Sequence, residues 1–242
     1  MTSVVRWVEV HRLAVAGGEA GIARAVGDRV GRVWLARSRF ADVARLAGLT
    51  LSLGEDAGSF SDLGVAKRAT GLPREALAAY EEALRLYRAV GDRAGEATTL
   101  NNIGLVYDGL GERARALEFY QQALPILREV GNRAGEATTL NNIGHLYDGL
   151  GERARALEFY QRALPIRREV GDRAGEAVTR YNLAMIHRGW GELDRAVTEL
   201  EQVVELDRQV GHPDLASDTA MLERVRQEQA RPDPGPTDLS AR

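Results

Sequence analysis

Residues 91–130 read GDRAGEATTLNNIGLVYDGLGERARALEFYQQALPILREV, and residues 131–170 repeat this stretch with only five differences. The substituted residues are Asp92, Leu105, Val106, Gln122 and Leu127, which become Asn132, His145, Leu146, Arg162 and Arg167. A looser third copy fills residues 171–210. Self-similarity at a period of about 20 to 50 residues is typical of repeat arrays, in which each repeat buries its apolar face against its neighbours. The period therefore decides the fold before any single motif is considered.

Each copy carries two stripes of apolar or small residues at helical spacing. The first stripe stands at positions i, i+3, i+4 and i+7 of one helix face and comprises Leu100, Ile103, Gly104 and Tyr107. Asp92 is a candidate N-cap of this first helix, called helix A, and the glycines at its other end predict its termination. The first stripe therefore predicts one helix at the start of every repeat.

The second stripe marks a helix B in the same repeat and comprises Ala116, Tyr120, Ala123, Leu124 and Leu127. The small Gly104 and Ala116 would let helices A and B approach closely, with tyrosine side chains filling the space beside them. Arg115 is expected on the exposed side of helix B, where its replacement would change stability little. Runs of strand length are missing, so the sequence predicts an all-α chain of helical hairpins.

The order of these residues resembles the tetratricopeptide repeat. In that family a helix A pattern L-N-N-I-G-x-x-Y is followed by a turn glycine and by a helix B pattern A-x-x-x-Y-x-x-A. This sequence shows the pattern at residues 100–107, at Gly111, and at Ala116, Tyr120 and Ala123. The resemblance implies a right-handed α-solenoid of tetratricopeptide-like helical hairpins, with a concave groove that takes up a protein or an extended peptide.

The length of the repeat and its junction sequence indicate which tetratricopeptide arrays this chain resembles most. The usual tetratricopeptide repeat has about 34 residues, whereas this one has 40. Forty-residue repeats joined by G-D-R-A-G-E-A are similar to the arrays of bacterial NB-ARC-type signalling ATPases and transcriptional regulators. No glycine precedes Lys67 as a Walker-type phosphate loop requires. The resemblance therefore implies that the ATPase domain of such a regulator does not lie on this chain.

The period also predicts how the chain is divided. Residues 55–210 are expected to form an array of four repeats, namely 55–90, 91–130, 131–170 and 171–210. Residues 1–54 are expected to hold degenerate N-terminal tetratricopeptide-like helices. Residues 211–231 predict a C-terminal capping helix that covers the last repeat. The proline-containing residues 232–242 predict a disordered tail.

Composition excludes several classes of function. The chain has no cysteine, which rules out disulfides, thiolate zinc sites and cysteine nucleophiles and favours a cytoplasmic location. A formal net charge of −3 argues against a nucleic-acid partner, because such a protein must neutralise many phosphates. No stretch approaches the roughly 20 apolar residues that span a bilayer. We therefore expect a soluble protein with neither a nucleic-acid nor a membrane partner.

No pattern in the sequence predicts a catalytic, cofactor or metal site. Gly109, Gly111 and Ala114 satisfy a G-x-G-x-x-A spacing, but a predicted helix precedes them where a dinucleotide site needs a strand. The four histidines never come within metal-ligand spacing of one another or of a carboxylate on one helix turn. His187 stands where Tyr107 stands in the second repeat of the array, which favours a packing role. We expect no catalytic residues, no cofactor and no metal, and thus no enzyme.

The resemblance places the partner-binding groove on the face of helix A that points away from helix B. Periodicity assigns to this face Asp62 and Arg68, then Thr98, Asn102, Leu105 and Asp108, then Thr138, Asn142, His145 and Asp148, and finally Asn182, Met185 and Arg188. Asparagine recurs in three successive repeats and offers both a donor and an acceptor, which suits the backbone of an extended peptide. In the alternative, these asparagines bond neighbouring helices and the aspartates are solvated surface charges.

The sequence therefore predicts a non-catalytic protein- or peptide-binding scaffold, as the sensor or adaptor module of a bacterial regulatory system. The alternative is a structural protein whose near-identical repeats self-assemble end to end through the N-terminal helix. An increase of mass with concentration, without any added partner, would favour the alternative.

Overall fold

The computed structural model describes residues 2–230, and every regular element in that range is an α-helix. Helices α1 to α7 are Thr2–Ala16, Ala20–Leu35, Phe40–Leu51, Ala57–Ala69, Pro73–Val90, Arg93–Gly109 and Arg113–Glu129. Helices α8 to α12 are Arg133–Gly149, Arg153–Glu169, Arg173–Gly189, Leu193–Val210 and Leu215–Ala230. The predicted all-α fold is confirmed. The predicted tail, 232–242, lies outside the described residues.

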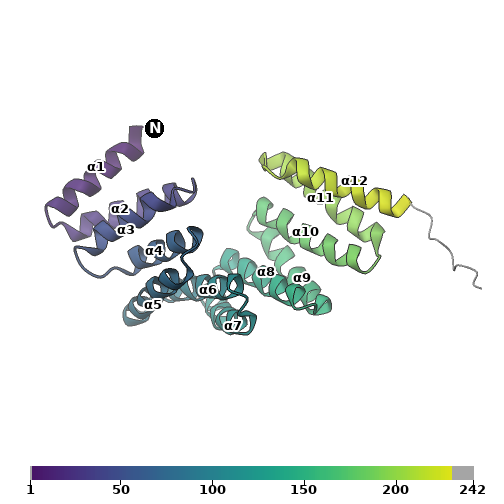
Figure 1. Cartoon of the computed structure of the whole chain (residues 1–242), viewed down its shortest axis with the longest axis horizontal. Helices are drawn as coiled ribbons and strands as arrows, with labels where there is room; N and C mark the ends of the chain where they lie inside the picture. The colour runs from purple at the N-terminus through teal and green to yellow at the C-terminus, as the bar shows by residue number, and fades with distance from the viewer. Residues whose placement is uncertain (1, 231–242) are drawn as a thin grey trace, which may run out of the picture. The chain divides into compact units, whose positions relative to one another are not determined.

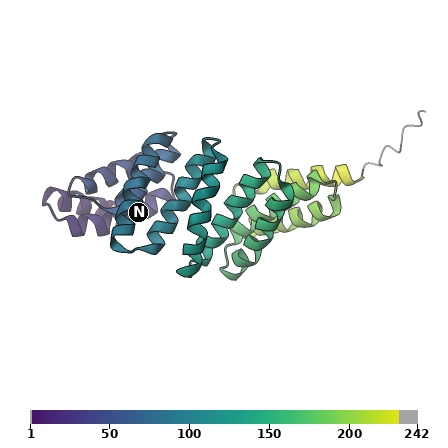
Figure 2. The same cartoon turned by 90° about the horizontal axis from the view of Figure 1, so that it is seen from below.

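The chain divides into two compact units, Met1–Asn132 and Arg133–Arg242. Consecutive helices pack against each other within each unit, as Figure 1 and the turned view in Figure 2 show. The pairs α4/α5 and α6/α7 are hairpins of the N-terminal unit, and α8/α9 and α10/α11 are hairpins of the C-terminal unit. Each of these hairpins joins one predicted helix A to its helix B, so residues 55–210 form the predicted helical hairpins.

The close approach within a hairpin depends on a glycine of helix A facing a tyrosine of helix B. A β-carbon added to Gly104 would lie 2.5 Å from Cε1 of Tyr120, and one added to Gly144 would lie 2.7 Å from Cε1 of Tyr160. Both tyrosines are buried, with 0% and 1% of their surface exposed. The absent side chain thus makes room for the ring, which fills the space between the helices.

The last hairpin fills the same position with a different pair of residues. Ala184 stands where the earlier repeats have glycine, and Leu200 stands where they have tyrosine. Both are fully buried in one apolar cluster with Ala196 and Val204. An added methyl group on helix A is therefore matched by a smaller side chain on helix B.

The G-D-R-A-G-E-A junction stabilises the start of helix A. The Asp92 carboxylate accepts a hydrogen bond of 2.9 Å from the backbone N–H of Gly95, as predicted for an N-cap. Glu96 is buried, yet it accepts hydrogen bonds from Arg93 and, at 2.8 Å, from Arg88 of the preceding helix. Burial raises the pKa of Glu96, but the two arginines outweigh burial and lower it. The repeated junction is thus a structural ion-pair network.

Turns between the paired helices are formed by glycine in the left-handed conformation. Gly111 has φ of 77° between α6 and α7, and the N–H of Glu112 behind it donates to the carbonyl of Tyr107 at 2.9 Å. A side chain at this φ would be strained, whereas glycine is not. This turn explains why the glycines at the predicted end of helix A recur with the period.

The last helix, α12, packs against α11. Its Leu222 and Val225 are buried in the cluster that holds Leu200 and Val204. This contact covers the apolar side of the last hairpin, as predicted for a capping helix.

Candidate functional site

The predicted groove residues all lie on helices A, and each is half-buried or exposed. In the N-terminal unit, α4 carries Asp62 and Arg68, and α6 carries Thr98, Asn102, Leu105 and Asp108. In the C-terminal unit, α8 carries Thr138, Asn142, His145 and Asp148, and α10 carries Asn182, Met185 and Arg188. We call this side of the helices the A-helix face, and we consider it separately in each unit.

Several groove residues of the C-terminal unit have partners within the chain. Arg188 donates two hydrogen bonds to Glu228 of α12, at 2.6 and 2.8 Å. The amide of Asn182 donates to the side chain of Asn141 on α8 at 3.5 Å, the outer limit for such a bond. Asn182 thus makes the contact between neighbouring helices that the alternative interpretation of the asparagines described, but the contact is long. His145, in contrast, is exposed.

Other groove residues are held by their own or adjacent helices. The hydroxyl of Thr98 donates to the carbonyl of Ala94 at 2.9 Å, so this proton is used inside α6. Asp62 packs against α2, because a β-carbon added to Gly31 would lie 2.5 Å from Asp62 Oδ2. Burial and the charges of Asp28 and Asp56 raise the pKa of Asp62 to about 6. Asp62 is therefore part of an acidic contact between α2 and α4.

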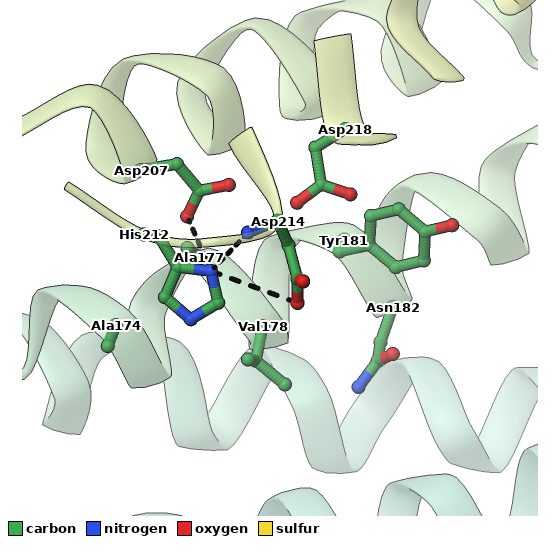
Figure 3. Close-up of a pocket in the computed structure, with 9 residues that line it drawn as sticks. All are labelled: Ala174, Ala177, Val178, Tyr181, Asn182, Asp207, His212, Asp214 and Asp218. Atoms are coloured by element: carbon green, nitrogen blue, oxygen red, sulfur yellow. Dashed lines mark hydrogen bonds and ion pairs between the residues drawn. The ribbon is translucent and has the colours of Figure 1, made fainter. Parts of the chain in front are cut away.

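A pocket of about 270 Å³ opens beside the A-helix face of the C-terminal unit (Figure 3). We call it the junction pocket; it is lined by Ala174, Ala177, Val178, Tyr181, Asn182, Asp207, His212, Asp214 and Asp218. The first five belong to α10, whereas the acidic residues and the histidine come from the end of α11, the following loop and α12. Val178 and Asn182 also stand on the A-helix face. The pocket therefore continues that face.

Asp207 is the deepest of the acidic residues, with 1% of its surface exposed, and its Oδ2 atom has no hydrogen-bond partner. Figure 3 shows its carboxylate beside that of Asp218, with His212 on its other side. Burial, contact with Asp207 and the charge of Asp214 raise the pKa of Asp218 to about 6. Asp218 can donate a hydrogen bond to Asp207 only while it is protonated, so this contact weakens as the pH rises.

The sequence did not single out this cluster, because the period contains no signal for it. Position 207 corresponds to Leu127 and Arg167 in the preceding repeats, so its residue type changes from apolar to basic to acidic. The position of His212 in the sequence gives no sign of the cluster either. Three different residue types at one buried position were the available sign that this junction had diverged.

Arg115 is exposed, as predicted, but it is bound to its own hairpin. Its guanidinium lies 4.0 Å from the centroid of the Tyr107 ring and donates to the Tyr107 hydroxyl at 2.7 Å. Arg155 and Tyr147 repeat the arrangement at 3.9 and 2.7 Å. Cation–π contact with a hydrogen bond contributes to stability even at an exposed site. We therefore expect the replacement of Arg115 to cost more stability than its exposed position alone indicates.

His187 is buried, as its predicted packing role requires, and its Nδ1 lies 2.7 Å from Oε2 of Glu192. Within residues 2–230, no group of three or more histidine or acidic side chains has a geometry that could hold a metal ion. No helix in that range is both long and apolar enough to cross a membrane.

The model of the tetratricopeptide repeat family matches residues 55–129, 114–169 and 135–209, which together cover more than half of the chain. The chain belongs to the tetratricopeptide repeat family. The predicted family is thus confirmed, and arrays of this kind present extended binding surfaces. The match begins at residue 55, so the tetratricopeptide-like character of residues 1–54 stays a prediction. No curated protein matches the sequence.

Several solved structures share the fold at low sequence identity. The apo form of the quorum sensor NprR from B. thuringiensis superposes with a TM-score of 0.76 at 17% identity, over 96% of this chain and 67% of that one. The apo form of RapI gives 0.65 at 17% identity, over 93% and 71% of the two chains. Aspartyl phosphate phosphatase F from Bacillus subtilis gives 0.63 at 11% identity, over 88% and 60%. These likenesses establish the fold alone.

Proposed function

We propose that this tetratricopeptide chain is a non-catalytic scaffold that binds an extended peptide segment on the A-helix face of its C-terminal unit. The observation that carries the proposal is the continuity of this face with the junction pocket through Val178 and Asn182. A row of half-buried and exposed side chains thus leads into a partly open pocket. Such a surface suits a peptide whose backbone lies on the row while one side chain enters the pocket.

The fold comparisons support a regulatory role in a bacterial cell, and we propose that the chain acts in the cytoplasm. Among the proteins that share the fold are one named a quorum sensor and one named a phosphatase. By analogy with the former, we propose that this chain is a sensor or adaptor module. We propose the same peptide-binding role, independently, for the A-helix face of the N-terminal unit around Asn102 and Leu105.

A display library of random dodecapeptides, panned on the full-length chain, tests the function. Selected peptides are labelled, and their Kd is measured by fluorescence anisotropy. Replacing Asn142 and Asn182 together by alanine removes two peptide hydrogen bonds worth about 0.5 to 1.5 kcal/mol each, so Kd should rise about 5- to 150-fold. The bond from Asn182 to Asn141 is long, so its loss alone should lower the melting temperature little. The melting temperature of the double variant is measured beside Kd, which separates a loss of binding from a loss of folding.

The matched control replaces Gln161 and Gln202 by alanine. These amides are exposed on α9 and α11, the helices B of the same unit. The control should bind like the unchanged chain. Equal loss of binding in both variants, or no loss in either, would show that the peptide site lies elsewhere.

Self-association is a second candidate, favoured by the surface of α1. Val5 is 72% exposed and Leu13 is 56% exposed on this helix. Together with Val10, they leave apolar area that a second copy of the chain could cover. Sedimentation velocity at increasing concentration tests this candidate, and replacing Val5 and Leu13 by serine should abolish any rise in mass.

A further inference from the structure

The junction pocket contains a buried carboxylate for which the described part of the chain supplies no cation. Burying a charge is costly unless it is paired or hydrogen-bonded. Asp207 is 1% exposed and its Oδ2 atom is unpartnered, although the atom faces the pocket beside Asp218 (Figure 3). No lysine or arginine lines the pocket. When Asp218 is deprotonated, a cationic donor group that enters the pocket would supply the missing partner.

His212 does not fill this role. Its Nδ1 accepts a hydrogen bond from the backbone N–H of Asp214 at 3.3 Å, which requires a lone pair on that nitrogen. The same Nδ1 lies 3.9 Å from Oδ1 of Asp207 and 3.8 Å from Oδ2 of Asp214, beyond hydrogen-bonding distance. His212 therefore makes no hydrogen bond to Asp207, and its contact is with Oδ1, so it leaves the Oδ2 atom of Asp207 without a partner.

The preceding junction shows what a completed pair looks like at this position. Arg167 occupies the position of Asp207 in the earlier repeat, and Asp172 occupies that of His212. Arg167 is 9% exposed, and its guanidinium donates to Asp172. The buried residue is therefore basic in the earlier junction, at Arg167, and acidic in the later one, at Asp207. The residue five positions further on changes from an aspartate to a histidine. The junction at Asp207 thus lacks the arginine that the junction at Arg167 contains.

The size and the lining of the pocket indicate which kind of group it binds. A volume of about 270 Å³ is below the usual range of small-molecule sites and suits a single long side chain. Ala177, Val178 and Tyr181 offer an apolar wall for its methylene groups. A guanidinium is more weakly hydrated than an ammonium, and its planar donors can reach two carboxylates at once. Two adjacent carboxylates, one of them almost fully buried, thus favour arginine over lysine.

We propose that the junction pocket binds the side chain of an arginine, with its guanidinium against the adjacent carboxylates of Asp207 and Asp218 and its methylene groups against Val178 and Tyr181. This inference rests on the proposed function, because it names the residue that a peptide on the A-helix face places in the pocket. It makes the partner a peptide with arginine at a fixed position.

The protonation of Asp218 fixes the pH dependence of binding. The groups that face Asp218 are Asp207 from α11, His212 and Asp214 from the loop, and Tyr181 from α10. Below a pH of about 6 the pocket holds a proton on Asp218, which a guanidinium must displace. Arginine binding should therefore strengthen as pH rises from 4 to 7.

The test uses the full-length chain and Nα-acetyl-arginine methylamide, followed by two-dimensional ¹H–¹⁵N NMR. The probe has no free α-amine, so only its side chain is cationic. We expect shifts confined to residues 174–182 and 207–218. The neutral isostere acetyl-citrulline methylamide should bind at least tenfold more weakly, and the lysine counterpart several-fold more weakly. Equal affinity for citrulline, tighter binding of lysine, or shifts centred elsewhere would overturn the proposal.

Asp207→Asn is the decisive variant, because it keeps the shape and removes the charge. Its affinity for the arginine probe should fall at least tenfold. Asp42→Asn, which makes the same charge change on α3, should leave the affinity unchanged. If Asp207→Asn does not fold, Asp218→Asn at the half-buried second carboxylate replaces it, with the same expected direction. Unchanged affinity in the variant that folds would contradict the proposal.

The outcome separates this inference from the proposed function. If the arginine probe fails but peptides without arginine bind through Asn142 and Asn182, the function stands and the arginine assignment fails. If the arginine probe binds while no longer peptide does, the pocket stands and the peptide-binding function fails.

Discussion

The ring of Tyr120 on α7 lies so close to Gly104 on α6 that a β-carbon at Gly104 would come within 2.5 Å of Tyr120 Cε1. Gly104→Ala should therefore lower the free energy of unfolding by about 1 to 3 kcal/mol through overpacking. Gly109→Ala is the matched control, since nothing lies within 4 Å of its added β-carbon. That variant should be unchanged or stabilised by up to about 1 kcal/mol. Urea denaturation measures both.

The last hairpin shows how the stability lost in Gly104→Ala can be recovered. Ala184 and Leu200 occupy the positions of Gly104 and Tyr120. The double variant Gly104→Ala with Tyr120→Leu should therefore be more stable than the sum of the two single losses, by about 0.5 to 3 kcal/mol of coupling. Strict additivity would show that the glycine and the tyrosine do not constrain each other.

Exchanging the residues at positions 127 and 167 of the two near-identical repeats tests how much stability a buried arginine costs. Arg167 is 9% exposed and its Nε is unpartnered, whereas Leu127 is 2% exposed at the same position. Replacing a buried ion pair by an apolar side chain is often neutral or stabilising by about 1 to 4 kcal/mol. Arg167→Leu should therefore melt no lower than the unchanged chain, and Leu127→Arg should melt lower. A marked loss in Arg167→Leu would mean that its pair with Asp172 stabilises the junction.

The raised pKa of Asp218 predicts how stability changes with pH. This carboxyl group has a pKa of about 6 in the folded chain against an ordinary value of 3.8, so it binds its proton more tightly when folded. Its contribution to the stability of the fold is complete below the pKa of the unfolded chain and is lost as pH rises through about 6. Asp218→Asn, which mimics the protonated form, should gain stability over the unchanged chain as pH rises from 4 to 7. A difference that stays constant with pH, measured by thermal melts, would contradict the assigned pKa.

Deleting residues 131–170 tests the array directly. After the deletion, Val130 meets Gly171 in the context in which Val170 meets it now. Stability in solenoids is close to a sum over repeats and their interfaces, so the loss should be graded. The shortened chain should keep the helical circular dichroism per residue of the full chain. Its complete loss would show that the repeats are not equivalent.

The period was enough to predict the hairpins, because each helix pair buries only what its own forty residues supply. The Asp92 cap and the glycine turn at Gly111 followed from residue type alone. The junction pocket could not be predicted, because it forms where the period ends and α12 brings Asp218 beside Asp207. The pairing of Arg188 with Glu228 was missed for the same reason, since its partner lies outside the repeats.

Photo-crosslinking tests the central claim, that a peptide lies on the A-helix face of the C-terminal unit, most directly. A library-selected peptide is synthesised with benzophenone at successive positions, irradiated with the full-length chain, and the labelled residues are identified by mass spectrometry. The account predicts labels on α8 and α10 around Asn142, His145 and Met185, with the peptide's arginine position labelling residues 174–182. Labels concentrated on the helices B, α9 and α11, would contradict it.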